Sequence, residues 1–445
     1  MVRSAIADDS FLNYLESFSK LDYPTVGLIL GQPTPIKDYI VHFARTPPFT
    51  GDGSNKSLQR IADISESWVA DHARHATRML PGGMYVLGIF FVCNEDLFTV
   101  YVSKLKSVVN QINKKLASNE FLHGIPLDVT DKLILIYSPS SKSYICKSYN
   151  PGNDVISSAN IKFEPNFSVK WLQLECKYEL DQVFPIVAFK ANWPLKKHMN
   201  DILKYINNTL KGGVFFFDGE VKDETDSLES IGKKRKVPRT KLGHHDNNEV
   251  KLLQVTIVLP GESISSEINT PTIDCGVQIR LGGHVATKLW LHPKATVKDA
   301  SLAIIQDIGR SLAARLDMHW DSLIEEEQDS PEDINTVHET PRRVLVNLPS
   351  SKVTLSDYLF PGEGPQEAQI SLKELLDIDI SEENGIFDIE GQADLTDLYR
   401  EGIEAESDDL LQKLPNTTNK YIYFSGLGIA FIVLIISLLL HIMQN

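Results

Sequence analysis

The sequence predicts an α/β protein with a three-layer N-terminal domain over residues 1–221 and a smaller α+β domain over residues 250–360. Segments with helical periodicity alternate with strand-like segments through both regions. Several of the predicted strands are apolar at every position, which is typical of strands covered on both faces. A polar stretch without periodicity, residues 222–249, separates the two regions and is interpreted as a charged linker. The chain of 445 residues, 42% of them hydrophobic, is long enough for more than one core.

The first region contains the clearest periodic segments. Strands are expected at residues 26–32, 38–48, 84–93, 131–139, 143–149, 169–180 and 212–221, and helices at residues 58–80, 96–118 and 192–211. The helix at 58–80 places Ile64 and Trp68 at helical spacing and ends at a Pro-Gly-Gly stop signal, residues 81–83. The segments 131–139 and 143–149 are close enough to form a hairpin.

The second region repeats the alternation on a smaller scale. Strands are expected at residues 251–260, 277–283, 285–293, 343–349 and 353–360, with one long amphipathic helix at 296–323. This helix carries Val297, Ala300, Ile304 and Ile308 on one face. The order of elements favours a compact α+β unit of about 110 residues.

Most of the net charge of −15 lies in one segment, residues 361–420, just before the end of the chain. Between Glu363 and Asp409 there are sixteen acidic residues against Lys373 and Arg400, a net charge of −14. We interpret this segment as a largely flexible acidic tether with one or two short helices able to dock on a partner. The rest of the chain is close to neutral and therefore has no overall basic field for nucleic acid.

Residues 421–443 predict a single transmembrane helix. The stretch has no Asp, Glu, Lys or Arg, and its 23 residues would span about 35 Å as a helix. Its fourteen Ile, Leu, Val and Phe residues favour insertion by about 6 kcal/mol. The residues assigned to the anchor include Tyr421, Gly426, Ala430, Leu440 and Met443. Because Lys413 and Lys420 precede the stretch, and no signal peptide is recognised upstream, we expect a tail-anchored protein with cytosolic N-terminal domains.

A basic run in the linker, Lys233, Lys234, Arg235 and Lys236, has three interpretations. It is typical of a solvated linker, it resembles a nuclear-import signal, and it has the charge needed to contact lipid headgroups. The acidic residues just upstream favour the solvated linker, and lipid contact is the next interpretation.

The sequence lacks the patterns of a metal or catalytic site. His72 and His75 are spaced by three residues, whereas zinc ligands on one helix usually use a spacing of four, and His72 falls on the apolar stripe of its helix. We therefore expect a core or hydrogen-bonded histidine. No phosphate-binding loop or GxSxG elbow occurs, and the four cysteines are widely spaced without a CxxC pair. We expect no catalytic residue, no cofactor and no metal.

Several longer segments together carry a resemblance to a known family. They are SWVADHARHATRMLPGGMYVLGIFFV at residues 67–92, GLILGQ, KDYIVHFARTPP, WLQLEC, GGVFFFDGEVKDE, VKDA, PRRVLVNLP and SDYLFPGE. With them the chain resembles the odr-four family, the odorant-response-abnormal protein four group, over essentially its whole length. The resemblance implies a single-pass protein of the endoplasmic reticulum membrane. Such a protein is expected to help a subset of G-protein-coupled receptors, odorant receptors among them, to mature and reach cilia or the cell surface.

The same resemblance implies that the first domain is similar to the MPN fold of JAMM-type isopeptidases. Active members carry His-x-His-Pro after the strand that matches GIFFVC, and Phe91 and Cys93 fall where the two histidines are expected. The resemblance therefore implies a pseudoenzyme scaffold. It also implies binding of the membrane-recruited protease specific for the ubiquitin-fold modifier Ufm, whose own N-terminal region is similar to this first domain.

Two functional hypotheses follow from these expectations. In the first, the chain is a tail-anchored, cytosol-facing adaptor for receptor maturation and trafficking, with ciliated sensory cells as one place of action. In the second, it is an inactive MPN-like subunit that anchors and activates the Ufm-specific cysteine protease at the endoplasmic reticulum. A third hypothesis, a zinc isopeptidase, requires a metal.

Overall fold

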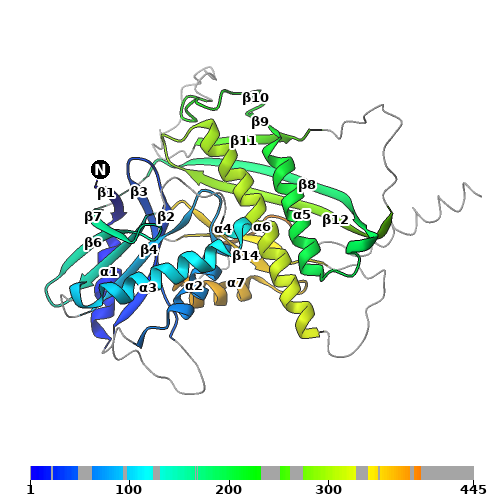
Figure 1. The fold of residues 1–445 in the computed structure, drawn as a ribbon. Coiled ribbons are helices and arrows are strands. Elements are labelled where there is room, and N and C mark those ends of the chain that lie inside the picture. Colours follow the sequence, from blue (N-terminus) through cyan, green and yellow to red (C-terminus); the bar gives the residue numbers. More distant parts are fainter. Residues whose placement is uncertain are drawn as a thin grey trace, which may run out of the picture. The chain divides into compact units, whose positions relative to one another are not determined.

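The computed structural model describes residues 2–21, 24–48, 63–93, 98–123, 131–165, 167, 169–231, 251–260, 274–326, 339–348, 351–380 and 385–391. All of them belong to one compact unit, Met1–Gln392. Within the described residues, three β-sheets and the helices around them form an α/β protein, as predicted from the sequence (Figure 1).

The first sheet is a closed barrel of seven strands in the order β1-β3-β2-β4-β5-β6-β7. The strands are β1 (Arg3–Asp8), β2 (Thr25–Gln32), β3 (Asp38–Arg45), β4 (Tyr85–Val92), β5 (Lys132–Ser138), β6 (Ser143–Asn150) and β7 (Val155–Glu164). The predicted β5–β6 hairpin is confirmed. Parallel pairing of β1 with β7 closes the barrel, and neither strand was predicted. β7 buries only Ile161, so it lacks the alternating apolar pattern that marks a strand in the sequence.

Both faces of β4 are covered, which explains its unbroken apolar sequence. Leu87 and Phe90 belong to one apolar cluster with α1 (Ser10–Ser17). Ile89 and Phe91 belong to a second cluster, which also contains residues of the two helices α2 (Glu66–Met79) and α3 (Phe98–Ala117). These helices correspond to the two predicted at 58–80 and 96–118.

The second sheet has the strand order β10-β9-β11-β8-β12. Its strands are β8 (Leu172–Val187), β9 (Val214–Phe217), β10 (Glu220–Val221), β11 (Lys251–Val258) and β12 (Cys275–Leu291). β8 pairs with both β11 and β12, so the sheet crosses the domain boundary expected near residue 221. Two helices, α5 (Leu195–Lys211) and α6 (Val297–Glu326), pack side by side and share an apolar cluster with this sheet (Figure 1).

Three local expectations in this region differ from the structure. The strands expected at 277–283 and 285–293 are one continuous strand, β12. The strand expected at 212–221 is two short strands, because the chain reverses at Asp218 and Gly219, which both have positive φ. The first part of the expected linker is folded, since Leu228 is fully buried and its N–H donates to the carbonyl oxygen of Ala295. The basic run from Lys233 to Lys236 lies outside the described residues.

The beginning of the expected acidic tether is part of the fold: one short helix is present, as the interpretation of residues 361–420 allowed, but it packs on this chain's own core. The third sheet has the order β14-β13-β15, made of β13 (Arg342–Asn347), β14 (Thr354–Leu359) and β15 (Ile386–Asp388). Helix α7 (Pro365–Leu376) follows β14 and buries Leu372 and Leu376 in the cluster shared with α2 and α3. The periodic apolar face of this segment, and not its acidic composition, therefore decides that it folds onto the core.

Three side chains hold the C-terminal end of α7. The last carbonyl groups of a helix have no partner inside the helix. His42 on β3 donates from Nε2 to the carbonyl oxygen of Leu376 at 2.7 Å, and His72 on α2 donates from Nε2 to that of Leu375 at 2.6 Å. The hydroxyl of Tyr14 donates to the carboxylate of Asp377, 3.1 Å away.

The remaining described helices are short: α4 (Glu120–His123) and the 3₁₀ turns Phe18–Lys20 and Ala188–Lys190. Over the residues that the structure describes, no helix has the length and apolarity needed to cross a membrane. The predicted anchor at 421–443 and the tether residues from 392 onward lie outside the described residues.

Truncation of a buried side chain on α7 tests whether this helix belongs to the folded unit. Leu372→Ala is expected to lower the free energy of unfolding by about 2–5 kcal/mol, because Leu372 is fully buried and its removal leaves a cavity. Ile370→Ala on the same helix removes a side chain that is 59% exposed, and we expect a change within about 0.5 kcal/mol. Urea unfolding of the full-length protein in detergent micelles measures both, and equal effects of the two substitutions would contradict the docking of α7.

Candidate functional site: a polar helix and a basic cleft

Helix α6 carries buried polar side chains within an otherwise apolar stretch, among them Gln306 and Asp307. The N–H of Gly82 donates to Oδ1 of Asp307 at 2.8 Å, and the N–H of Gly83 donates to Oε1 of Gln306 at 2.8 Å. These bonds hold the Pro-Gly-Gly turn, residues 81–83, against α6. The turn is therefore a docking point for α6 as well as the end of α2.

The two glycines are required by the geometry of this contact. Gly83 has φ of +80°, a conformation that residues with a Cβ rarely adopt. A Cβ at Gly82 would overlap the carbonyl oxygen of Ala303 on α6. The backbone of the turn can therefore approach the helix only where no side chain intervenes.

Arg310 is buried on the same helix with 1% of its surface exposed. Its guanidinium donates to the carbonyl oxygens of Leu80, Pro81, Met84, Leu122 and His123 over 2.8–3.3 Å. Burial lowers the pKa of Arg310, and the carbonyl dipoles stabilise the charge in place of water. One side chain thereby fixes the end of α2, the following turn and the end of α4.

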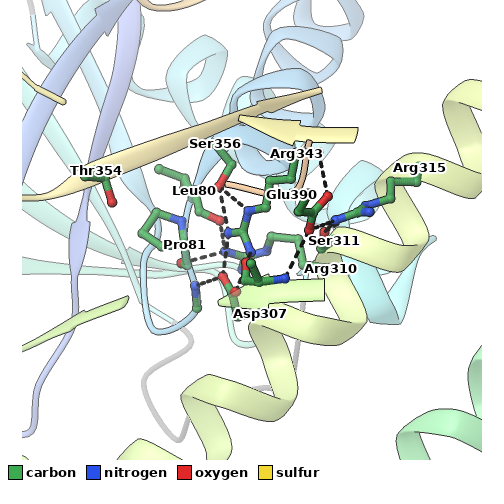
Figure 2. Close-up of polar contacts among 12 residues, drawn as sticks. Leu80, Pro81, Asp307, Arg310, Ser311, Arg315, Arg343, Thr354, Ser356 and Glu390 are labelled. Atoms are coloured by element: carbon green, nitrogen blue, oxygen red, sulfur yellow. Dashed lines mark hydrogen bonds and ion pairs between the residues drawn. The ribbon is translucent and has the colours of Figure 1, made fainter. Parts of the chain in front are cut away.

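Asp307 and Arg343, on α6 and β13, form an ion pair in which both side chains are 1% exposed. The two parallel bonds of the pair measure 2.6 and 3.0 Å. The other guanidinium N–H groups donate to Oγ of Ser356 (Figure 2) and to the carbonyl oxygen of Ala286. Burial by itself lowers the pKa of Arg343, but the Asp307 carboxylate outweighs burial and raises it. All five donors of the guanidinium are thus used.

Glu390, just after β15, extends this network to the second and third sheets (Figure 2). Its carboxylate accepts from Arg315 of α6 at 2.5 Å, from the N–H of Arg343 at 2.8 Å and from the N–H of Ala286 on β12 at 3.0 Å. The carboxylate is 4% exposed. α6, β12, β13 and the residues after β15 consequently share one buried polar network.

The four cysteines of the chain all lie in the described residues and are free thiols. Cys146 and Cys176 are buried, and burial raises the pKa of each thiol to about 12. A thiol with so high a pKa is a poor nucleophile. Cys275 is exposed on β12, where its Sγ lies 3.1 Å from the carbonyl oxygen of Val277.

His72 is a buried, hydrogen-bonded histidine, as predicted. Besides its bond to Leu375, its Nδ1 accepts from the hydroxyl of Thr46 at 3.1 Å, so both ring nitrogens are occupied. Burial lowers the pKa of His72 to about 4. Burial also lowers the pKa of His75 to about 4, with Arg78 and Arg74 adding to the effect. Among the described residues, no group of three or more His, Cys, Asp or Glu side chains is placed to hold a metal ion.

The two positions that the resemblance aligned with metal-binding histidines pack against an apolar cluster. Phe91 is 1% exposed at the end of β4. Cys93 is half-buried beside the same cluster, and its N–H donates to the carbonyl oxygen of Tyr137 at 3.1 Å.

The C-terminal half of α6 lines a cleft of about 500 Å³ together with α5, α4 and the end of α3. We call this the α5–α6 cleft. Its charged residues are Arg74, Lys115, Glu120, Lys196, Lys204 and Asp317. Three of the larger lining residues, Phe121, Leu203 and Leu316, are buried apolar side chains, and we call them the apolar base of the cleft.

Asp317 is the central anion of the α5–α6 cleft. Its carboxylate is 10% exposed and pairs with Arg78 at 2.5 Å, with Arg74, and with Lys196 at 3.6 Å. Burial opposes ionisation of Asp317, but Arg78 and Arg74 outweigh it and hold the pKa below its ordinary value. Four cations against two anions leave the lining of the cleft with a positive charge.

Neither the buried network nor the cleft was predicted from the sequence. The signal for the network was present, because Asp307, Arg310 and Arg315 interrupt a helix stretch that is otherwise apolar. Charged residues at such positions indicate buried partners. The cleft carries no comparable signal, since its lining comes from α2 to α6 and is assembled only by tertiary packing.

The fold and this network define a mixed α/β barrel protein organised around one polar helix. The chain belongs to the ODR4-like family, described as odorant response abnormal 4-like, which matches residues 27–386. This confirms the resemblance noted in the sequence. The chain is 29% identical over 385 residues to Protein odr-4 homolog of Gallus gallus, covering 85% of this chain and 84% of that protein.

Further relatives support the same family. The chain is 29% identical over 388 residues to Protein odr-4 homolog of Homo sapiens, with 85% and 84% of the two chains covered. It is 23% identical over 361 residues to Odorant response abnormal protein 4 of Caenorhabditis elegans, with 78% and 70% covered. Among solved structures, the chain is similar to the crystal structure of UfSP from C. elegans with a TM-score of 0.45 and 9% identity, covering 85% of this chain and 57% of that chain.

Removing one partner of the buried ion pair is expected to be strongly destabilising. Arg343→Met leaves Asp307 charged and buried, and the free energy of unfolding should fall by about 3–5 kcal/mol. Arg280→Met removes a pair with Asp181 whose side chains are 52% and 67% exposed, and should cost at most about 1 kcal/mol. Replacing both partners, Asp307→Leu with Arg343→Met, should recover part of the loss. Urea unfolding measures the series, and similar losses for Arg343→Met and Arg280→Met would contradict the role of the pair.

The buried histidines predict loss of stability in mild acid. The folded-state pKa of His72 is about 4 and the unfolded value is about 6.5, so only the unfolded chain binds the proton between these values. Stability from His72 is therefore complete above pH 6.5 and falls by up to about 3 kcal/mol as the pH drops to 4. The measurement is the urea midpoint against pH for the native chain and for His72→Gln, whose amide can still donate to Leu375. The urea midpoint of the variant should change less with pH than that of the native chain. An unchanged slope would show that His72 does not cause the loss of stability in acid.

Proposed function

We propose that this protein is a membrane-anchored accessory protein that aids maturation and trafficking of a subset of G-protein-coupled receptors, odorant receptors among them, to cilia or the cell surface. The observation that carries the proposal is family membership over residues 27–386, together with a relative named Odorant response abnormal protein 4. The breadth of the match, which includes strands β3 to β7 of the barrel, α6 and the strands β13 and β14, favours a shared function of the whole folded unit.

The proposed location is the endoplasmic reticulum membrane, with the folded unit in the cytosol. The support is the uncharged apolar stretch at 421–443, preceded by Lys413 and Lys420. The basic run Lys233, Lys234, Arg235 and Lys236 is proposed as a secondary contact with anionic headgroups. In ciliated sensory cells this placement would put the folded unit beside newly made receptors.

We infer that the protein acts by binding rather than by catalysis. The buried charged groups of the α6 network are all engaged: Asp307 pairs with Arg343, Glu390 pairs with Arg315, and Arg310 donates to backbone carbonyl groups. Phe91 and Cys93, which the MPN resemblance places at histidine positions, pack against an apolar cluster. These observations support a pseudoenzyme scaffold.

A second candidate function rests on the same two positions. If the barrel is an MPN-like domain without its metal ligands, it can serve as the inactive partner of a related active protein. We propose as the alternative that the chain anchors and activates a Ufm-specific cysteine protease at the endoplasmic reticulum. The two functions are compatible, because modification at the membrane could be a step in receptor maturation.

A cell experiment separates the two proposals. Cells that lack the protein should deliver fewer odorant-type receptors to the surface, and full-length protein should restore delivery whereas a chain ending at Lys413 should not. Surface labelling of the receptor and blotting of Ufm conjugates are measured in the same cells. A version with an unrelated apolar helix in place of 421–443 is the control for simple tethering.

The outcomes assign the function directly. Lost receptor delivery with normal conjugates supports the receptor function. Abnormal conjugates with normal receptor delivery support the protease function, and both defects together support the combined one. Normal receptors and normal conjugates would overturn both proposals.

A further inference from the structure

We propose that the α5–α6 cleft binds an acidic peptide segment of a partner protein, with an apolar side chain of that segment seated on the base of the cleft. The assignment goes beyond the proposed function and does not depend on it. It rests on the arrangement of charge, exposure and apolar surface in the cleft.

One wall of the cleft is a row of polar side chains on α5. Lys196, Asn200 and Lys204 follow each other at intervals of four residues, so they lie along one side of the helix. The side chain of Lys196 is 53% exposed. Lys204 is exposed and makes no ion pair with any residue that the structure describes. Two amines with an amide between them can therefore reach a ligand in the cleft.

Cationic side chains also line the side of the cleft that α2 and α3 form. Lys115 of α3 is 40% exposed and pairs with Asp71 at 2.5 Å. Arg74 of α2 is 26% exposed and pairs with Asp317. A ligand between these helices and α5 would meet positive charge from both directions, which favours a ligand with several carboxylates over one with a single charge.

The existing anions do not cancel this charge. Asp317 is shared by Arg74, Arg78 and Lys196, so one carboxylate faces three cations. Glu120, the second anion of the lining, is exposed at the start of α4. Lys204, and Lys196 with its long contact to the shared Asp317, are therefore the amines available to an incoming carboxylate.

The apolar base of the cleft indicates that the ligand also has an apolar side chain. Phe121, Leu203 and Leu316 are 9%, 5% and 7% exposed and come from three different helices. Trp320 and Met199 add half-buried apolar surface beside them. A cleft of about 500 Å³ with such a base accommodates one or two apolar side chains. An acidic segment that contains leucine or an aromatic residue matches both features.

The concave shape favours a peptide over a membrane surface. A flat bilayer can contact cations on a protruding face, whereas here the cations line a concave cleft together with buried apolar side chains. A polypeptide segment can enter such a space and place side chains on both walls and on the base. We therefore assign the cleft to a protein ligand.

Fluorescence anisotropy of the full-length protein in detergent micelles tests this assignment. The probe is a fluorescein-labelled peptide of Glu-Glu-Leu repeats, and the matched probe has Gln-Gln-Leu repeats. The Glu peptide should bind at least about tenfold more tightly than the Gln peptide, and added salt should reduce the difference.

Paired charge reversals locate the binding. Lys196→Glu with Lys204→Glu should weaken binding of the Glu peptide by about tenfold or more. Lys162→Glu with Lys177→Glu makes the same change of charge on exposed side chains outside the cleft and should leave binding nearly unchanged. Lys196→Gln with Lys204→Gln should have an intermediate effect. All four lysines are exposed, so urea unfolding should show that each variant retains its stability.

Three results would overturn the assignment. The two peptides could bind equally, or the control pair Lys162→Glu with Lys177→Glu could weaken binding as much as the cleft pair. Short-chain phosphatidylserine could also bind in place of the peptide with the same dependence on Lys196 and Lys204, which would assign the cleft to lipid. Because the measurement needs neither receptor nor protease, its failure leaves the proposed function unaffected.

Discussion

The buried ion pair between Asp307 and Arg343 is the constraint on which the rest of the fold depends. Removing two charges from water costs several kcal/mol for each ion, and the attraction between them offsets this only when the remaining donors and acceptors are satisfied. Here Asp307 also accepts from the N–H of Gly82, and Arg343 also donates to Ser356 and Ala286. These bonds exist in one rotation and one axial position of α6. We infer that the pair contributes mainly specificity, since it makes other placements of this apolar helix costly.

Helix α6 carries charged residues in two different environments, the buried core and the α5–α6 cleft. Arg310 is surrounded by backbone carbonyl groups and closed off from water, so its charge organises the ends of α2 and α4. Two turns further along the helix, Asp317 lines the α5–α6 cleft and pairs with Arg74 and Arg78. The inner charges are fully paired and the outer ones leave exposed amines. A rigid α6, held from within, is a suitable support for a cleft that has to present its cations in fixed positions.

Helix α7 shows how an acidic segment can belong to a folded unit. Its buried face places Leu372 and Leu376 in the core, while its acidic residues face outward. Burial lowers the pKa of His42 and of His72, so both imidazoles are neutral. Each donates from Nε2 to one of the terminal carbonyl groups of α7. Composition alone predicts a tether here, since net charge is an average over a segment and does not report the direction in which each side chain points.

The sequence by itself determined the elements with a strong local period, among them β2, β4, the β5–β6 hairpin and most of α2, α3 and α6. It also indicated the buried, hydrogen-bonded state of His72 and the family, because these follow from spacing along one element and from contiguous motifs. Only the tertiary structure decided the closure of the barrel by β1 and β7, the single sheet across residue 221, the docking of α7, and the partners of Asp307 and Glu390. Periodicity reports which face of an element is apolar. Which distant element covers that face depends on long-range packing, and no local pattern records it.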